Sequence, residues 1–289
     1  MLDTPKLLRI LGISSKELEG LLKGIDEFYY LKSSPKLNKK TGLPLIAKNG
    51  KPRTRDLYPS IKLLKTVQQR IYHRFLKSIK LPAYAFGGIS KRDNVLNAKM
   101  HQGNKFFFNT DLRNFYPGIT HQQVFDMFVR NKIPLEAASI LTKLTTYKGM
   151  LPQGTPTSPY LANLVFVSVG KKIQILADEH GLTFTTFVDD IAVSGKNDFK
   201  PLVNTIIDLL INNGFKISHD KTFYQTKRPK VTNVIVANNG IYLDSSYKEK
   251  ILTFEDPLSA AARGTLNYYD RVKKISRTKK SRFKSKLGF

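Results

Sequence analysis

The sequence predicts an α+β fold built around an antiparallel sheet, and three observations support this prediction. Residues 106–111 form a short apolar run that ends on an acid, as a buried strand would. Residues 182–194 read as a strand, a tight turn and a second strand, which is the pattern of an antiparallel hairpin. Residues 121–130, 134–146 and 160–177, which lie between these strands, read as helices.

The first hundred residues are expected to hold helices around a basic segment. Two short helices are expected within residues 5–30, where leucine and isoleucine alternate with charged side chains at helical spacing. Residues 31–60 carry lysines and arginines among glycines and prolines, which indicates a hairpin or a loop. This segment is either a solvated linker or a finger that contacts phosphates. A helix with a buried stripe is expected over 60–79, and a Gly-Gly turn with a short helix over 81–101.

The C-terminal part is expected to alternate between helix and strand. A helix is predicted over 199–213, a strand that then turns over 215–222, and a hairpin over 231–243. The tail, residues 245–289, is helical and basic in pattern. It is either a solubilising tail or a helix that grips nucleic acid.

The composition indicates a nucleic-acid partner. The 289 residues are 41% hydrophobic, which suffices for one composite domain or two to three subdomains. The 48 Lys+Arg and 22 Asp+Glu give a net charge of +26, which repels itself unless a polyanion compensates it. An anionic membrane is the alternative partner, but no run of about 20 apolar residues is evident. Because cysteine is absent, disulfides and thiolate zinc sites are excluded. No signal-peptide pattern is evident, so a cytoplasmic protein is expected.

Two acids lie at the tip of the predicted hairpin, and a third ends the first predicted strand. Asp189 and Asp190 are adjacent, and Asp111 precedes them by 78 residues. Adjacent carboxylates repel each other unless a cation neutralises them, so the pair indicates either a metal site or a solvated turn. If the hairpin lies beside the first strand, the three carboxylates converge. They could then hold two Mg²⁺ ions, or Mn²⁺, about 3.5–4 Å apart, as in nucleotidyl transfer.

Five segments resemble the motifs of reverse transcriptases, specifically of the bacterial retron-type group within the group II intron and retron superfamily. Residues 108–116 resemble the first catalytic motif, and residues 187–190 resemble the Tyr-x-Asp-Asp box. Residues 151–159 resemble the Gln-Gly…Ser-Pro motif. Residues 97–101 read Asn-Ala-x-x-His, and residues 231–233 stand where retron enzymes usually show Val-Thr-Gly. The resemblance covers roughly residues 5–275.

The resemblance implies a right-hand polymerase with fingers, palm and thumb. Fingers are expected over residues 1–100, a palm with an antiparallel, RRM-like sheet over 101–235, and a short helical thumb with the basic tail over 236–289. Two residues depart from the family pattern. Phe187 replaces the usual Tyr. The replacement loses a hydroxyl but keeps the aromatic ring, so activity should survive. Asn233 replaces Gly, and because Asn tolerates a left-handed backbone, the turn should persist.

The resemblance also implies roles for individual residues. The metal ligands would be Asp111, Asp189 and Asp190, with the Leu112 carbonyl as a further ligand. The incoming nucleotide would meet Tyr116, Gln153, Lys221 and either Arg53 or Arg55. Tyr116 would lie under the sugar and favour dNTP over NTP, its alternative role being core packing. Lys221 would be an acid for pyrophosphate or a solvated lysine. Nucleic-acid contacts are expected from Asn97, His101, Lys273, Lys274, Arg277, Lys279, Lys280 and Arg282.

The leading hypothesis is a retron reverse transcriptase. It would bind a structured noncoding RNA, prime from an RNA 2′-hydroxyl, and use dNTPs to make a short single-stranded DNA joined to that RNA. A role in bacterial antiphage defence with a separate effector protein is expected, without a membrane partner. One alternative is another stand-alone defence reverse transcriptase with protein-primed or untemplated synthesis. The alternative of another class is a catalytically silent RNA-binding palm protein.

Overall fold

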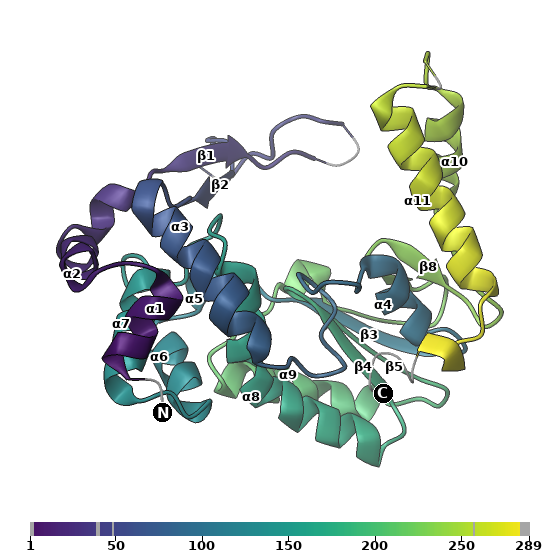
Figure 1. Cartoon of the computed structure of the whole chain (residues 1–289). Helices are drawn as coiled ribbons and strands as arrows, with labels where there is room; N and C mark the ends of the chain where they lie inside the picture. Colours follow the sequence, from purple (N-terminus) through teal and green to yellow (C-terminus); the bar gives the residue numbers. More distant parts are fainter. Residues whose placement is uncertain (1–2, 39–40, 48, 257, 284–289) are drawn as a thin grey trace. The chain divides into compact units, whose positions relative to one another are not determined.

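The computed structural model describes residues 3–38, 41–47, 49–256 and 258–283 (Figure 1). The chain divides into two compact units. The first unit contains Met1–Lys80 and Tyr116–Val165, and the second contains Leu81–Phe115 and Phe166–Phe289. This division differs from the predicted boundaries at residues 100 and 235, because residues 116–165 pack with the first eighty. The assignment to fingers, palm and thumb stays a prediction.

The first unit is mainly helical. Its helical elements are α1 (Thr4–Leu11), α2 (Ser15–Lys23), the 3₁₀ turn η1 (Ile25–Phe28), α3 (Lys62–Arg70), the π turn η2 (Ile71–Phe75), the 3₁₀ turn η3 (Leu76–Ser78), α6 (His121–Arg130) and α7 (Leu135–Thr145). Helices α5 (Phe115–Gly118) and α8 (Ser158–Glu179) each begin in one unit and end in the other. The predicted helices over 5–30, 121–130 and 134–146 are therefore confirmed.

Local sequence explains where the first helices begin. The Asp3 carboxylate accepts the Lys6 N–H at 2.9 Å and caps α1. Ser14 and Glu17 form a reciprocal capping box at the start of α2. Buried Gln68 then joins α3 to its neighbours, because its amide donates to the Tyr29 hydroxyl at 3.0 Å and to the Leu144 carbonyl at 2.8 Å. These bonds satisfy a polar group that would otherwise destabilise the core.

The basic segment of the first unit is a β-ribbon. Strand β1 (Lys32–Pro35) pairs antiparallel with β2 (Thr54–Leu57), and the pairing runs from Lys32↔Leu57 to Pro35↔Thr54. Isolated bridges Leu37↔Pro44 and Ile46↔Pro52 extend it. The hairpin interpretation of residues 31–60 is confirmed, with residues 39, 40 and 48 outside the described residues.

The second unit holds a four-stranded antiparallel sheet in the order β4-β5-β3-β6. The strands are β3 (Phe106–Asp111), β4 (Thr183–Phe187), β5 (Asp190–Gly195) and β6 (Phe223–Gln225). The hairpin over 182–194 and the strand ending on Asp111 are confirmed. Residues 215–222 are predicted to form a strand and then turn. The turn is confirmed by the 3₁₀ turn η5 (His219–Lys221), whereas the strand is reduced to a single bridge between Ile217 and Leu112. The chain turns there because the Ser218 carbonyl accepts the Lys221 N–H at 2.9 Å.

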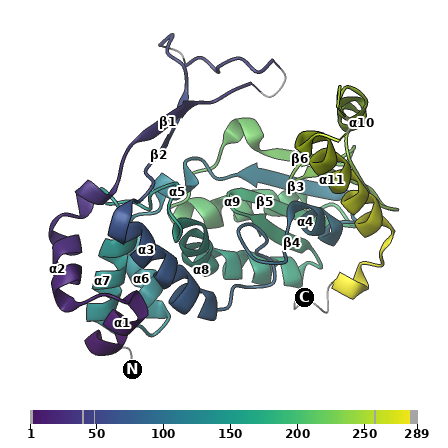
Figure 2. The ribbon, with the colours of Figure 1, turned by 45° about the horizontal axis from the view of Figure 1, so that its top comes forward.

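One face of this sheet carries a helix over part of its length and Asp111 and Asp190 at one end. Residues paired across antiparallel strands point to the same face, as do residues two apart along a strand. Asp111↔Asp190 and Asn109↔Ala192 therefore share a face with Phe107. Helix α4 (Asn94–Met100) packs on that face around Phe107 and Ala192. The opposite face carries α9 (Val203–Asn212), which follows the 3₁₀ turn η4 (Lys200–Leu202), and the C-terminal part of α8 (Figure 2).

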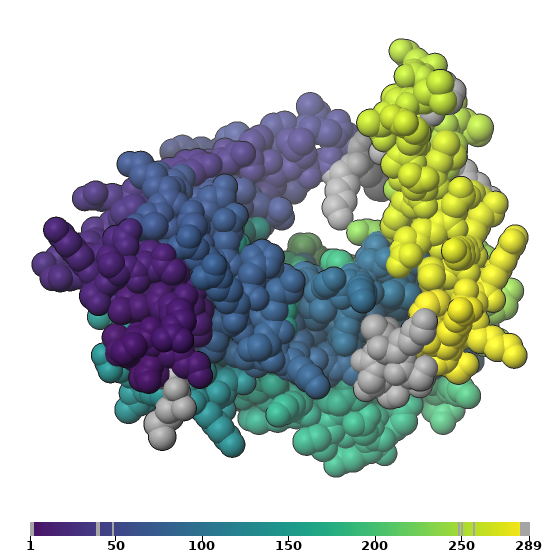
Figure 3. All heavy atoms as spheres, viewed as in Figure 1, coloured from purple at the N-terminus to yellow at the C-terminus, as the bar shows by residue number. Residues whose placement is uncertain are grey.

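A second, three-stranded sheet and two helices complete this unit. The sheet is β7 (Lys230–Val231), β8 (Val234–Val236) and β9 (Ile241–Tyr242), which confirms the hairpin predicted over 231–243. Helices α10 (Ser245–Leu252) and α11 (Ala260–Arg277) follow, and their exposed sides are seen in yellow-green and yellow in Figure 3. Residues 284–289 of the predicted helical tail lie outside the described residues.

Within the described residues, one helix, α8, is long and apolar enough to cross a membrane by length and composition alone. Its most apolar stretch has a mean hydropathy of 1.2, and 61% of that stretch is buried inside the structure. A core helix of a globular protein has the same properties, so this observation is weak evidence for a membrane span.

Candidate active site

The three predicted acids meet at one end of the four-stranded sheet. The pairing of β3 with β5 sets Asp111 directly opposite Asp190, and the turn before β5 adds Asp189. One carboxylate oxygen from each of the three lies within 4.8 Å of the others. The predicted convergence is therefore confirmed. Three hard oxygen donors at this spacing fit a divalent cation such as Mg²⁺ or Mn²⁺.

The turn that carries the aspartates has an unusual backbone. Val188 has φ of +59°, in the left-handed region that a β-branched residue rarely adopts. The Leu112 N–H donates to the Asp189 carbonyl at 2.8 Å and fastens the turn to the end of β3. The ring of Phe187, which stands in place of the family's Tyr, packs against the apolar cluster beneath α4. The aromatic ring makes this packing contact without the hydroxyl that a Tyr would add.

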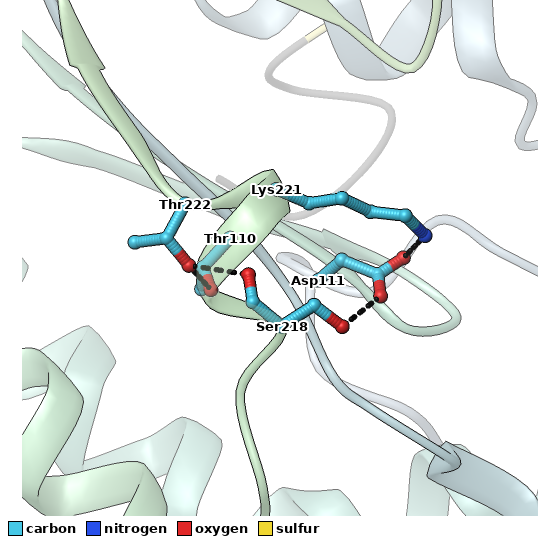
Figure 4. Close-up of polar contacts among 5 residues, drawn as sticks. All are labelled: Thr110, Asp111, Ser218, Lys221 and Thr222. Carbon is cyan, nitrogen blue, oxygen red and sulfur yellow. Dashed lines mark hydrogen bonds and ion pairs between the residues drawn. The ribbon is translucent and has the colours of Figure 1, made fainter. Parts of the chain in front are cut away.

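Asp111 is almost buried and holds a partner on each oxygen (Figure 4). The Ser218 hydroxyl donates to its Oδ1 at 2.8 Å, and the Lys221 ammonium lies 2.8 Å from its Oδ2. The Thr222 hydroxyl donates to the Ser218 carbonyl at 2.9 Å, which steadies this loop. Sequence reasoning missed Ser218, and the signal for it was that an acid ending a buried strand needs a partner.

The carboxylates set the protonation of Lys221. Partial burial lowers the pKa of this ammonium, but the hydrogen bond that it donates to Asp111 and the charges of Asp111, Asp189 and Asp190 outweigh this effect, so the pKa lies above its ordinary value. The site thus already attracts a cation, as expected of a metal centre.

Three of the residues predicted to contact the nucleotide, Arg55, Tyr116 and Gln153, lie together in the first unit, whereas Lys221 belongs to the second. A hollow of about 400 Å³ is lined by Ser34, Arg55, Leu57, Tyr116, Gln153, Gly154, Thr155 and Pro159. The Tyr58 N–H donates to the Gln153 carbonyl at 2.7 Å and joins the ribbon to this loop. Of the two arginines that spacing left open, Arg55 is among the residues that line the hollow and Arg53 is not; the contact with a triphosphate stays a prediction. Tyr116 is half-buried and lines the hollow, so its ring is not enclosed in the core.

Two residues predicted to contact nucleic acid are buried instead. Asn97 and His101 are 1% and 0% exposed. The His101 ring lies 2.7 Å from the hydroxyls of both Ser194 and Thr185, on strands β5 and β4. Burial, and the nearby charge of Lys280, lower the pKa of His101 to about 3, so the ring is neutral. Neither side chain is available to nucleic acid, and the predicted contact is wrong for both.

Most of the lysines and arginines of α11 and the segment after it that are predicted to contact nucleic acid are exposed, and the contact itself stays a prediction. This group contains Lys273, Lys274, Arg277, Lys279 and Arg282. Lys273 lies over the Tyr269 ring at 4.8 Å. Lys280 is partly buried, and its ammonium donates to the Gln102 carbonyl at 3.2 Å. Lys280 therefore fastens the chain just after α4, whereas the other five side chains are exposed.

A larger groove of about 970 Å³ lies at the other end of the four-stranded sheet. Among its lining residues are Asn104, Thr183 and Lys196. Asn104 precedes β3, Thr183 begins β4 and Lys196 follows β5, so the groove lies a full strand length from the aspartates. Although this groove is larger, it is not the candidate active site, because Asp111, Asp189 and Asp190 do not line it.

Comparison with known proteins agrees with this geometry. The family model described as reverse transcriptase (RNA-dependent DNA polymerase) matches residues 46–254. Retron Ec86 reverse transcriptase from Escherichia coli is 31% identical over 209 residues, which cover 70% of this chain and 65% of that protein. Retron Se72 reverse transcriptase from Salmonella heidelberg is 26% identical over 241 residues, covering 82% and 60%. The chain thus spans less than two thirds of the length of these relatives.

A solved structure with a similar fold is telomerase from Candida albicans, in a complex with a fragment of telomeric RNA. Its TM-score is 0.51 at 11% identity, over 80% of this chain and 51% of that one, which shows the fold alone. The predicted α+β polymerase fold is confirmed. The chain belongs to the reverse transcriptase (RNA-dependent DNA polymerase) family, and its relatives are of the retron type.

Proposed function

We propose that the protein is a retron reverse transcriptase, which copies RNA into DNA by nucleotidyl transfer with two divalent cations. The observation that carries this proposal is the cluster of Asp111, Asp189 and Asp190 within 4.8 Å, in a family of RNA-dependent DNA polymerases. A protein that only bound RNA would have no need to gather three carboxylates, which repel each other without a cation.

The three aspartates would hold the cations, with the Leu112 carbonyl as a further ligand. Bound divalent cations lower the pKa of a hydroxyl nucleophile and neutralise the charge that develops on a transferred phosphoryl group. Ser218 orients the Asp111 carboxylate for this task. The Lys221 ammonium lies 2.8 Å from Asp111 as long as no cation displaces it from that oxygen, and after displacement it would donate its proton to leaving pyrophosphate.

The incoming nucleotide would be a dNTP held by the hollow around Tyr116 and Gln153. Arg55 supplies a guanidinium that matches phosphate geometry. The half-buried Tyr116 ring would lie under the sugar and exclude a 2′-hydroxyl. Gly154 has a φ of +106°, a conformation in which a residue with a side chain would be strained. Because glycine has no side chain, the nucleotide could approach the backbone of this loop closely.

The template would be a structured noncoding RNA. The net charge of +26 and the exposed lysines and arginines after α11 supply the attraction to a polyanion. We propose that synthesis begins at an RNA 2′-hydroxyl and yields single-stranded DNA joined to RNA. The proposed setting is the bacterial cytoplasm, in antiphage defence with a separate effector protein.

The test is expression with the neighbouring DNA, followed by sequencing of the nucleic acid that co-purifies. A branched RNA–DNA molecule is the expected product, and Asp189→Asn and Asp190→Asn should each abolish it. Purified protein should extend a primer on an RNA template with Mg²⁺ and dNTPs. Unbranched DNA would favour a protein-primed or untemplated enzyme, and RNA without DNA would favour a silent binder. Extension undiminished in both variants would show that the catalytic site is elsewhere.

A further inference from the structure

A short segment of the second unit runs along the free edge of the catalytic hairpin. Strand β4 is an edge strand of the sheet, and residues 84–87 cover its outer side at Thr186. The Phe86 N–H donates to the Thr186 carbonyl at 2.8 Å, and the Thr186 N–H donates to the Tyr84 carbonyl at 2.8 Å. This parallel pairing ends next to the turn that bears the aspartates.

The turn needs support because its backbone is unfavourable. Val188 is β-branched and has φ of +59°. Such a conformation persists only where the surrounding structure enforces it. Asp189 and Asp190 follow directly, so any relaxation of Val188 would move both carboxylates relative to Asp111.

Gly87 touches this turn without space for any side chain. A Cβ at Gly87 would lie 2.4 Å from the Val188 nitrogen, 2.5 Å from Val188 Cγ2 and 2.9 Å from the Phe187 carbonyl carbon. Two of these atoms belong to the backbone, so no rotamer change can relieve the overlap. The φ of Gly87 lies outside the left-handed region, and glycine is therefore needed for space alone.

The covering segment is itself held firmly in place. One guanidinium nitrogen of Arg92 donates to the carbonyls of Pro82 and Ala83, each at 2.9 Å, and to that of Ala85 at 2.5 Å. Hydrogen bonds from a charged donor are stronger than neutral ones. The segment is thus a rigid support, and a displacement at Gly87 would be transmitted to the turn.

We infer that residues 84–87 are a splint for the catalytic turn and that Gly87 is a positioning residue. By letting the splint approach Val188, Gly87 fixes the separation between Asp189–Asp190 and Asp111. This inference rests on the proposed function, since the separation matters only for binding cations between these carboxylates. A side chain at this position pushes the turn away and opens the cluster.

The test is Gly87→Ala, assayed by Mn²⁺ binding with electron paramagnetic resonance and by primer extension. The Kd for Mn²⁺ should rise at least about tenfold, and kcat should fall by roughly 100-fold, as for a misplacement of about 1 Å. The KM for dNTP should stay within about twofold, because the nucleotide hollow is not touched. A general loss of folded protein would not weaken Mn²⁺ binding and lower kcat while leaving the KM for dNTP unchanged.

Gly195→Ala is the matched control. Gly195 lies on β5, at the end far from the turn, and a Cβ there would meet the Leu182 side chain at 2.6 Å. Its Kd for Mn²⁺ should equal that of the wild type, whatever its melting temperature. If Gly87→Ala does not fold, Arg92→Gln replaces it, because this change loosens the splint without adding an overlap. It should weaken Mn²⁺ binding several-fold.

Wild-type Mn²⁺ affinity in a folded Gly87→Ala or Arg92→Gln variant would overturn the inference. Equal weakening in Gly195→Ala would overturn it as well. These outcomes are separate from failure of the proposed function. A wild type that binds Mn²⁺ but extends no primer contradicts the function alone, and a Gly87→Ala variant that extends like an active wild type contradicts the splint alone.

Discussion

Both carboxylate oxygens of Asp111 already have a hydrogen-bond partner, Ser218 on Oδ1 and Lys221 on Oδ2. Ser218 can keep its hydrogen bond while a cation binds, since a carboxylate oxygen accepts more than one donor. Lys221 cannot stay, because an ammonium 2.8 Å from Oδ2 repels a cation at the same oxygen. Lys221 therefore competes with the metal that the site requires.

This competition predicts that Lys221→Met binds Mn²⁺ more tightly than the wild type while extending primers more slowly. The ammonium is 58% exposed, so its repulsion is screened and the gain should be only about fivefold in Kd. Titration of Mn²⁺ by electron paramagnetic resonance measures it. The matched control is Lys216→Met, at an exposed lysine on the same segment. Unchanged or weaker binding in Lys221→Met would show that Lys221 does not compete.

The sequence allowed the three acids to be predicted, but not the partners of Asp111. An acid after an apolar strand and two acids in a hairpin turn are local patterns. Ser218 and Lys221 meet Asp111 only because residue 217 bridges Leu112, and no local pattern encodes that pairing. The same reason explains why the strand predicted before the turn at His219–Lys221 is reduced to one bridge at Ile217, where tertiary contacts overrode an alternating pattern.

At the scale of elements, α4 is a connector and not a surface for nucleic acid. His101, which follows its last residue, reaches β4 and β5. Asn94 donates to the Tyr268 hydroxyl of α11 at 2.6 Å, and buried Lys99 donates to the Ser276 carbonyl at 2.8 Å. The nucleic-acid contact predicted for Asn97 and His101 came from the resemblance of this segment to a family motif, and a motif does not show which of its side chains are buried. Here Asn94 and Lys99 both face α11, whereas His101 faces the four-stranded sheet, and this cannot be read from helical periodicity.

The burial of His101 predicts a pH dependence of stability. Its pKa is about 3 in the fold, against an ordinary value of 6.5, so the unfolded chain takes up a proton first as pH falls. The contribution of neutral His101 is complete above pH 6.5 and is lost as pH falls toward 3. Between these values the free energy of unfolding should decline by up to about 1.4 kcal/mol per pH unit.

Urea denaturation between pH 7 and pH 5 measures this slope. His101→Gln cannot titrate there and should remove most of the slope, beyond its own loss of stability. His121→Gln is the matched control, because burial lowers the pKa of His121 too but its ring is only partly buried. If the slope is the same in His101→Gln and in the wild type, another group is responsible.

At the scale of the whole molecule, the order of motifs was predictable and the division into units was not. Motifs are contiguous, so their order along the chain survives any fold. The packing of residues 116–165 with the first eighty depends on which helices meet, and the pattern of apolar residues shows only that each has a face to bury. The Asn233 departure illustrates a local prediction that held, since its φ is +67° and the left-handed turn persists.

Charge is the other property of the whole chain that can be tested. With a net charge of +26, attraction to RNA is expected from many lysines and arginines, so losing any three would weaken binding somewhat. Direct contacts with phosphates have a different salt dependence, because each lysine or arginine that neutralises a phosphate releases a counterion. Each such contact adds about 0.7 to 0.9 to the slope of log Kd against log salt concentration.

Lys273→Gln/Lys274→Gln/Arg277→Gln, on the last turns of α11, should therefore reduce that slope by about two to three when RNA binding is titrated across salt concentrations. Lys6→Gln/Lys16→Gln/Lys65→Gln removes the same charge from exposed positions on α1, α2 and α3, and should leave the slope nearly unchanged. Both variants lower the net charge equally, so a difference in slope isolates contact from general attraction. Equal slopes would mean that α11 does not grip RNA and that its basic residues act only through the overall field.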